Sequence, residues 1–209
     1  MTSLEKQLQS EKLLPLYTVT DLALLPIAEK ILLENQLHFI EVTYRSSLAS
    51  VAIRQLAESN KLIVGAGTVC DLETAKDAIA NGAKFIVMPG LNTEVINYCI
   101  EQNVPVYPGA VTPSEIIQAM NLGLKTVKFF PANIYGGLNA IKNLIGPFPN
   151  IQFIPTGGIN ENNFVEYTKN NSILAVGGSF ILSENLIAKD MGLTASKNLQ
   201  LLLEKLNKQ

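Results

Sequence analysis

The sequence is poor in the side chains that bind metals or form disulfide bonds. His38 is the only histidine in 209 residues, which excludes most histidine-based metal sites and every Ser-His triad except one built on His38. Cys70 and Cys99 are the only cysteines, and a chain long enough to bury a large core needs no disulfide framework. We therefore expect no metal site, no cofactor, two ordinary thiols and a histidine that packs at a strand edge.

Charged residues and long apolar runs are also scarce. Only 16% of the residues are charged, the formal net charge is −2 and the pI is near 5.5. Lysine and arginine do not cluster, so the sequence lacks the basic patch with which proteins bind nucleic acid. No apolar run approaches the roughly 20 residues that span a bilayer, and the polar N-terminus does not resemble a signal peptide. We expect a cytoplasmic protein that acts on a small molecule and binds neither nucleic acid nor membranes.

Hydrophobic residues make up 47% of the chain, enough for one domain that covers residues 1–209. Short runs typical of β-strands recur along the sequence, and each is followed by a stretch with helical periodicity. The expected strands are residues 16–19, 39–44, 62–67, 85–88, 104–107, 126–130, 152–155 and 173–176. The expected helices are residues 22–36, 46–59, 72–81, 93–102, 114–122, 137–145, 161–169 and 194–208.

Capping residues support these boundaries. A capping box, Thr2-x-x-Glu5, predicts an additional N-terminal helix that ends near Lys12. Caps are expected at Thr20, Ser46, Asp71, Asn92, Thr112 and Asn160 for helix starts, and at Gly82 and Gly123 for helix ends. Eight strand-helix repeats with short connections predict an α/β fold, a (β/α)₈ TIM barrel with an extra N-terminal helix. A doubly wound open sheet is the alternative.

One lysine stands inside a short apolar strand. Lys128 occupies the run Thr126-Val-Lys-Phe-Phe-Pro131, and burying an ammonium group is costly unless it deprotonates or finds a partner. A dry pocket or a nearby cation favours the neutral amine, which can form a Schiff base with a carbonyl compound. The alternative is an exposed lysine on an edge strand.

Two further charged residues lie on the expected second strand. Glu41, Thr43 and Arg45 are spaced by two, so they share one face of the strand, and in a barrel we expect that face to point inward. A carboxylate and a guanidinium are costly to bury, although each on its own could belong to a structural ion pair. Together with an inward Lys128 they form a candidate catalytic set at the carboxyl ends of the strands, where barrels carry their active sites.

Glycine-rich segments follow the last two expected strands. Pro155-Thr-Gly-Gly158 and Gly177-Gly-Ser179 bring backbone without Cβ atoms to the strand ends. Barrels commonly bind phosphate there through backbone N–H groups and the N-terminus of a short helix, which we expect at Ser179-Phe-Ile-Leu182. These segments predict a phosphate-binding end.

Seven short motifs, taken in order, resemble those of one enzyme family. They are Glu41-Val-Thr-Tyr-Arg45, Gly65-Ala-Gly-Thr-Val69, Pro89-Gly90, Pro108-Gly109, Lys128-Phe-Phe-Pro131, Thr156-Gly-Gly-Ile159 and Gly177-Gly-Ser179. The set is similar to that of the 2-keto-3-deoxy-6-phosphogluconate / 4-hydroxy-2-oxoglutarate aldolases, and the match runs from about Leu14 to Ser183. Each motif is weak alone, but the ordered set is specific.

The resemblance implies a class I, metal-independent aldolase that assembles as a homotrimer. Its substrate would be the phosphorylated keto acid, cleaved to pyruvate and glyceraldehyde 3-phosphate, or 4-hydroxy-2-oxoglutarate, cleaved to pyruvate and glyoxylate. By the same resemblance Lys128 forms the Schiff base, Glu41 is the acid/base, and Arg45 and Thr68 bind the keto acid. The remaining matched positions are Pro89 and Phe130 at the pocket wall, Gly157, Gly158, Gly178 and Ser179 at the phosphate end, and Thr156 and Gly177 as further substrate-binding residues.

Three departures from the family pattern concern substrate choice. Leu16-Tyr-Thr18 stands where many relatives have an arginine, Met88 stands where serine or threonine is common, and Asn133-Ile-Tyr-Gly136 departs from the frequent Pro-Ala-Glu continuation. None of them removes a candidate catalytic group.

Three alternative functions differ from this interpretation in specific residues. The phosphogalactonate aldolases have a motif that resembles Lys-Ile-Phe-Pro, with asparagine in place of Arg45 and valine in place of Thr156. This chain differs from them at these positions and is more similar to the gluconate/oxoglutarate group. A metal-dependent epimerase requires His/Asp ligands that are missing here. A non-catalytic sugar-phosphate-binding barrel would share the phosphate end and lack the Schiff base.

Overall fold

The computed structural model describes residues 1–208, and its first element begins at the predicted capping box. Helix α1 (Ser3–Glu11) starts after Thr2, whose hydroxyl accepts a hydrogen bond from the Glu5 N–H (3.2 Å) while the Glu5 carboxylate accepts one from the Thr2 N–H (2.8 Å). Glu5 also accepts a hydrogen bond from the Thr126 hydroxyl (2.9 Å). The helix is thereby held against the start of a strand.

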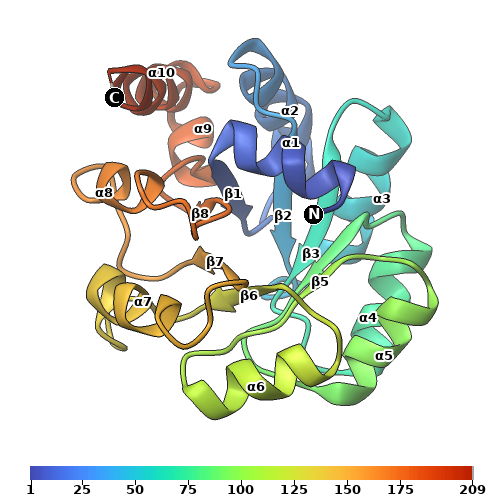
Figure 1. Ribbon diagram of the computed structural model, residues 1–209. Helices are drawn as coiled ribbons and strands as arrows, with labels where there is room; N and C mark the ends of the chain where they lie inside the picture. The colour runs from blue at the N-terminus through green and yellow to red at the C-terminus, as the bar shows by residue number, and fades with distance from the viewer. Residues whose placement is uncertain (209) are drawn as a thin grey trace.

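Eight strands alternate with the helices, and all of their pairings are parallel (Figure 1). They are β1 (Leu13–Tyr17), β2 (Phe39–Thr43), β3 (Ile63–Gly67), β4 (Phe85–Val87), β5 (Val106–Tyr107), β6 (Thr126–Phe129), β7 (Gln152–Pro155) and β8 (Val176–Gly178). The pairing order is β5-β4-β3-β2-β1-β8, with β6 and β7 as a separate pair. Single bridges join Gly109 to Lys128 and Thr156 to Gly177. The parallel sheet is therefore curled, as in a TIM-like barrel.

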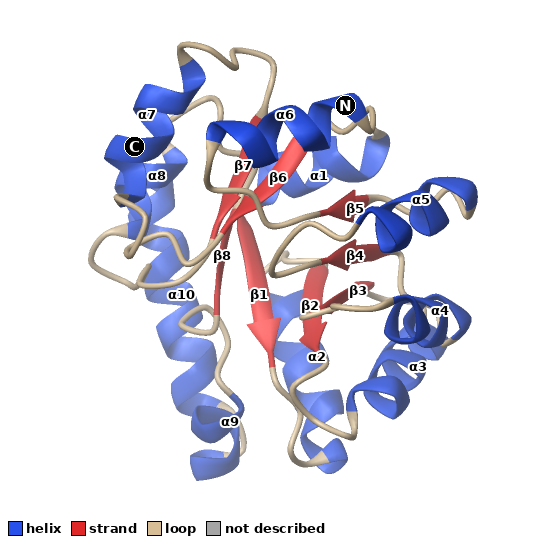
Figure 2. Cartoon of the chain, turned by 90° about the horizontal axis from the view of Figure 1, so that it is seen from below, coloured by secondary structure: helices blue, strands red, loops and turns tan. Residues whose placement is uncertain are grey.

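The helices cover the outer side of this sheet, as Figure 2 shows. They are α2 (Leu25–Glu34, preceded by the 3₁₀ turn η1, Leu22–Leu24), α3 (Ala49–Ser59), α4 (Leu72–Ala80), α5 (Thr93–Glu101), α6 (Pro113–Asn121), α7 (Gly137–Ile145), α8 (Phe164–Thr168), α9 (Glu184–Asp190) and α10 (Leu193–Asn207). Helix α3 illustrates why they dock: Ala49, Ala52, Ile53 and Leu56 are buried at helical spacing and form one apolar stripe.

Side-chain alternation along the strands separates an inner from an outer core. On β2, Phe39 packs with Phe85, Tyr107 and Ile154 inside the curled sheet, whereas its neighbour Ile40 packs with the helices. Leu8 of α1 belongs to the inner group, so this helix covers the amino-terminal side of the sheet. The buried polar residues lie at both ends of the interior: Thr126 starts β6 beside α1, whereas Thr43 and Thr156 lie at the carboxyl ends of β2 and β7.

His38 lies at the start of the second strand, at the strand edge where the sequence predicts it. Its backbone N–H donates to the Glu11 carboxylate (2.8 Å), and its ring Nδ1 lies 2.9 Å from the other oxygen of that carboxylate. The contact ties the end of α1 to β2.

Several predicted caps are confirmed, and others are displaced by one or a few residues. Asp71, Asn92 and Thr112 accept hydrogen bonds from the first turns of α4, α5 and α6. Asp21 rather than Thr20 caps η1, and Asn163 rather than Asn160 precedes α8. Polar residues in the sequence therefore locate the helix starts to within a few residues, which is sufficient to predict the order of the elements.

The C-terminal part departs most from expectation. Strand β8 comprises Val176–Gly178 instead of residues 173–176, because its register is set by pairing of Leu13 with Val176 and Pro15 with Gly178. The first strand likewise begins earlier than predicted, at Leu13. The prediction of a short helix at residues 179–182 is wrong. These residues form a turn and a bend, and α9 begins only after Ser183. Within residues 1–208, no helix is long and apolar enough to span a membrane.

Candidate active site

Strand β6 turns Lys128 into the interior of the curled sheet. Val127 and Phe129 belong to the outer core, so Lys128 between them points to the inner side, where only 3% of its surface is exposed. Its backbone is fixed on one side by hydrogen bonds to Pro108 and from Ala110 (2.8 and 2.9 Å). On the other side it pairs with β7. The alternative of an exposed lysine on an edge strand is therefore wrong.

The carboxylate of Glu41 is the ionic partner of this lysine. Glu41 Oε1 lies 3.5 Å from Lys128 Nζ, and Glu41 is 1% exposed. Neither carboxylate oxygen of Glu41 has a hydrogen-bond partner within residues 1–208. Buried oxygens usually do, so the interaction with Lys128 is the main one that offsets the burial of this carboxylate.

Burial raises the pKa of the Glu41 carboxyl above its ordinary value, because the charged form loses its hydration. The positive charges of Lys128 and, to a smaller extent, Arg45 oppose this rise in the pKa. A carboxyl group held in this way exchanges its proton closer to neutral pH than an exposed glutamate does, which suits an acid/base catalyst.

Gly67 provides the space for this carboxylate. Gly67 lies on β3 beside Thr43 of β2, and a Cβ atom added to it would overlap Oε1 of Glu41. Gly177 has the same relation to Thr156: an added Cβ would overlap the Thr156 hydroxyl, which is buried and makes no hydrogen bond within the described residues. Both glycines occupy strand positions at which any side chain would fill the polar interior.

We predict that Gly67→Ala damages activity more than it damages folding. The added methyl group overpacks the interior, which costs about 1–3 kcal/mol in the free energy of unfolding. It also displaces Glu41 from Lys128, and a misplacement of about 1 Å can cost roughly 10²-fold in rate. The checks are thermal unfolding and the rate of pyruvate release.

Gly146→Ala is the matched control for this prediction. Gly146 has helical φ and ψ at the end of α7, and an added Cβ meets only an ordinary contact at 3.5 Å. We expect this control to keep full activity. Unchanged activity of the Gly67→Ala variant would show that the Glu41 position tolerates displacement.

Phe130 borders the Lys128 side chain, and Thr156 lies at the end of the neighbouring strand. The Phe130 ring centroid lies 5.1 Å from Nζ, within the range of a cation–π contact, and the ring is half-buried. Thr156 directly follows β7, the strand that pairs with β6. Phe130 thus brings an apolar ring to the amine, and Thr156 brings a buried hydroxyl to the carboxyl side of the sheet.

Arg45 and Thr68 stand in the turns that follow β2 and β3. Arg45 lies beyond the end of β2 and is exposed, so it stands at the rim rather than in the buried interior, and its charge lowers the pKa of Glu41. Thr68 has a φ of 60°, a left-handed conformation that is unusual and strained for a β-branched residue. Strain of this kind is typical of functional positions.

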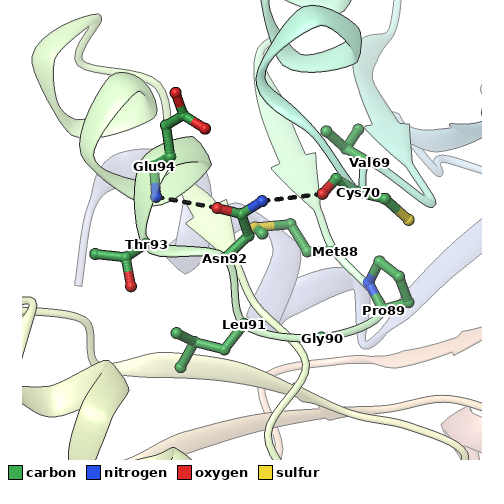
Figure 3. Close-up of a pocket in the computed structure, with 9 residues that line it drawn as sticks. All are labelled: Val69, Cys70, Met88, Pro89, Gly90, Leu91, Asn92, Thr93 and Glu94. Carbon is green, nitrogen blue, oxygen red and sulfur yellow. Dashed lines mark hydrogen bonds between the residues drawn. The ribbon is translucent and has the colours of Figure 1, made fainter.

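Pro89 follows β4 and lines one wall of a surface cavity of about 590 Å³, drawn in Figure 3. The other walls come from residues 69–70, 88 and 90–94. Asn92 holds this region together, because its side chain donates to the Cys70 carbonyl (3.1 Å) and accepts from the Glu94 N–H (3.0 Å). The cavity includes Pro89 and does not include Lys128 or Glu41, so it is distinct from the space around the lysine.

The glycine-rich segments meet at the carboxyl ends of β7 and β8. Gly157 and Gly158 have φ values of +93° and +72°, which favour glycine, and Thr156 bridges to Gly177. Gly177 and Gly178 are the last residues of β8, and Ser179 is exposed in the turn that follows. The four glycines and Ser179 are thus brought together without the helix that the sequence predicts at residues 179–182.

Two features of the site went unrecognised in the sequence. Gly67 lies in a motif that the sequence singles out, yet only the register of β2 and β3 reveals that it makes room for Glu41. Thr43 and Thr18 share a hydrogen bond of 2.7 Å between their hydroxyl groups, which joins the ends of β1 and β2. Their spacing in the sequence gives no sign of this contact.

Within residues 1–208, no three His, Cys, Asp or Glu side chains gather as metal ligands.

Known proteins resemble this chain over most of its length. A family model described as KDPG and KHG aldolase matches residues 4–194. The 2-dehydro-3-deoxy-phosphogluconate aldolase of Haemophilus influenzae is 41% identical, with 78% of this chain and 77% of that protein covered. The KHG/KDPG aldolase of Escherichia coli K12 is 37% identical, with 87% and 85% covered.

A solved structure agrees with these relatives. The KDPG aldolase of Legionella pneumophila has a TM-score of 0.89 and 30% sequence identity, and the match covers 97% of this chain and 98% of that one. The predicted resemblance is confirmed: the chain belongs to the KDPG and KHG aldolase family.

Proposed function

We propose that this chain is a class I aldolase that cleaves 2-keto-3-deoxy-6-phosphogluconate to pyruvate and glyceraldehyde 3-phosphate, and 4-hydroxy-2-oxoglutarate to pyruvate and glyoxylate. The observation that carries the proposal is the buried pair of Lys128 and Glu41, 3.5 Å apart, in a chain of this family. Support comes from the Legionella pneumophila relative, which was captured with pyruvate as a covalent carbinolamine.

Lys128 is the nucleophile of the proposed reaction. Its neutral amine adds to the C2 carbonyl carbon of the keto acid, and the resulting carbinolamine loses water to give a protonated imine. When the C3–C4 bond breaks, its electron pair moves toward the iminium nitrogen and leaves an enamine, while the C4 hydroxyl loses its proton and becomes the aldehyde. Protonation of C3 and addition of water then release pyruvate and restore the amine.

Glu41 moves the protons in these steps. It accepts the C4 hydroxyl proton during cleavage and returns a proton to C3 of the enamine, directly or through one water. The raised pKa of its carboxyl and the two unpaired oxygens support this role, because the group must gain and lose a proton in each cycle. Gly67 keeps the space in which the carboxylate turns from one atom to the other.

The keto-acid end is formed by four residues around Lys128. Arg45 binds the carboxylate of the keto acid through its guanidinium, and its exposed side chain at the rim closes onto the substrate. Thr68 contributes a hydroxyl group from its strained turn. Pro89 and Phe130 form apolar walls, and the Phe130 ring additionally faces the positive charge of the imine.

The phosphate end is formed mainly by backbone. Within residues 1–208, the N–H groups of Gly158 and Ser179 donate no hydrogen bond, so they are free to bind phosphate oxygens. Gly157, Gly177 and Gly178 let the chain approach the phosphate closely. The unpartnered hydroxyl of Thr156, a residue that bridges to Gly177, binds a hydroxyl group of the substrate.

We further propose the barrel type, the domain extent, the independence from metals and cofactors, and the assembly of the protein. The curled sheet is a (β/α)₈ TIM barrel with α1 as its extra N-terminal helix, and residues 1–209 form one domain. The enzyme works without a metal or cofactor, as Schiff-base chemistry needs neither. It assembles as a homotrimer in the cytoplasm.

A coupled assay of pyruvate release tests the proposed function. Lactate dehydrogenase and NADH report pyruvate from the phosphogluconate-derived substrate, from its galactonate epimer and from 4-hydroxy-2-oxoglutarate. We expect the phosphogluconate-derived substrate and 4-hydroxy-2-oxoglutarate to be cleaved and the galactonate epimer to be cleaved least. The reason is that Arg45 and Thr156 are the residues that the gluconate/oxoglutarate group resembles at these positions. No pyruvate from any of them would favour a non-catalytic sugar-phosphate-binding protein, and preference for the epimer would favour a phosphogalactonate aldolase.

Arg45→Ala is predicted to shift the pH dependence of the reaction. The positive charge of Arg45 lowers the pKa of Glu41 and so favours its carboxylate; removal of that charge raises the pKa further. The acid limb of the profile of kcat/KM against pH should therefore move to higher pH, together with a higher KM. An acid limb that stays in place, or moves to lower pH, would contradict an electrostatic role of Arg45 toward Glu41.

A further inference from the structure

Asn133 stands beside the proposed phosphate end without an assigned role. It follows β6 in the segment that departs from the frequent Pro-Ala-Glu pattern, and its N–H donates to the carbonyl of Gly157 (3.1 Å). The loop after β6 is thereby fastened to the loop after β7. The backbone of Asn133 is fixed, while its side chain is exposed and makes no hydrogen bond within residues 1–208.

The side chain of Asn133 lies directly over Gly158. A Cβ atom added to Gly158 would overlap Cβ and Cγ of Asn133 and would lie 2.7 Å from Nδ2. On its other side, Gly158 is held through its carbonyl, which accepts a hydrogen bond from the Asn163 side chain (3.1 Å). Gly158 is therefore flanked by two asparagine side chains but stays exposed, and its own N–H remains without an acceptor within residues 1–208.

The distance between the two free donors suits a phosphate group. A Cβ position is about 2.5 Å from the nitrogen of its own residue, so Nδ2 of Asn133 lies within roughly 5 Å of the Gly158 nitrogen. Two oxygens of one phosphate can accept hydrogen bonds from donors at this separation. Asparagine brings an N–H donor to this place and carries no negative charge that would repel the anion.

We propose that Asn133 is a specificity-determining residue that binds the phosphate of the substrate together with the Gly158 N–H. The proposal rests on the proposed aldolase function and extends it: the side chain favours phosphorylated over unphosphorylated keto acids. It acts at the end of the substrate that is remote from Lys128.

The test compares Asn133→Asp with the matched variant Asn139→Asp. Aspartate has the size of asparagine but replaces the donor with a negative charge, and Asn139 is an exposed residue of α7. For Asn133→Asp we expect kcat/KM on the phosphorylated six-carbon substrate to fall about tenfold or more, the scale of a hydrogen bond to a charged group. Activity on 4-hydroxy-2-oxoglutarate should stay within about twofold, and Asn139→Asp should change neither.

Calorimetric titration with inorganic phosphate separates this proposal from the aldolase function, because it needs no turnover. Weaker phosphate binding by Asn133→Asp than by Asn139→Asp supports the contact even if wild-type protein releases no pyruvate, a result that would defeat only the proposed function. Equal losses on both substrates, an unchanged substrate ratio or no phosphate binding by wild-type protein would overturn the role of Asn133.

Discussion

Replacement of Lys128 by methionine is expected to lower pyruvate release to the level of a reaction without enzyme, while the protein still folds. Methionine fills a buried site of similar size and cannot form an imine. Glu41 then loses its ionic partner, but its carboxyl, whose pKa is already raised by burial, avoids an unpaired charge by taking up a proton. The coupled pyruvate assay and circular dichroism measure the two outcomes.

Lys125→Met is the control for this variant. Lys125 is an exposed residue just before β6, so the same substitution three positions away should leave activity unchanged. Pyruvate release by the Lys128→Met variant at more than a few per cent of the wild-type rate, measured after mass spectrometry excludes contaminating wild-type enzyme, would contradict the role of Lys128.

Glu41→Gln is expected to lower turnover by about 10² to 10⁴, the usual scale for a positioned acid/base catalyst. Glutamine keeps the shape that fits beside Gly67 but cannot accept and return a proton. The amine of Lys128 remains in place, so imine formation with pyruvate should persist at a reduced rate. Steady-state kinetics of pyruvate release gives the first effect, and trapping with pyruvate and borohydride gives the second.

Glu58→Gln, on the exposed side of α3, serves as the neutral comparison. It removes the same charge without touching the site and should match the wild-type protein. Turnover of the Glu41→Gln variant within about threefold of wild type would show that water or another group transfers the proton.

Much of the fold follows from periodicity and caps. Helices are predicted well where a stripe of buried residues repeats over several turns, as in α3, and where a side-chain cap marks the start, as at Asp71 and Thr112. The strands are predicted because short apolar runs between helices are typical of the buried strands of a parallel sheet. Local sequence determines these features, so the sequence alone reveals them.

The end of the chain was harder to predict because tertiary contacts determine it. Glycines contribute no apolar pattern, so the sequence predicts a loop at Gly177 and Gly178. In the structure both residues pair with β1 and form the end of β8. Helix α9 is short and buries only Ile187, which gives no periodic signal. Its first residue, Glu184, accepts hydrogen bonds from the backbone N–H groups of Thr20 and Asp21 (2.8 and 3.0 Å), contacts that span most of the sequence.

The candidate site was predictable as a set of residues but not as a geometry. Alternation along β6 and β2 correctly turns Lys128 and Glu41 inward, because both lie within strands. The same rule does not determine the direction of Arg45, because the strand ends before it. The space beside Glu41 depends on the register of β2 with β3, and the cover over Gly158 depends on the loop after β6. Such contacts join residues whose sequence positions are unrelated.

The central claim is that Lys128 forms a Schiff base, and the most direct test is reduction with borohydride in the presence of pyruvate, followed by peptide mapping. We predict one adduct per chain, on the peptide that contains Lys128, with no adduct in the Lys128→Met variant. Exposed lysines such as Lys125 provide internal comparisons in the same digest. An adduct on another lysine, or none at all under conditions in which pyruvate is released from substrate, would contradict the account.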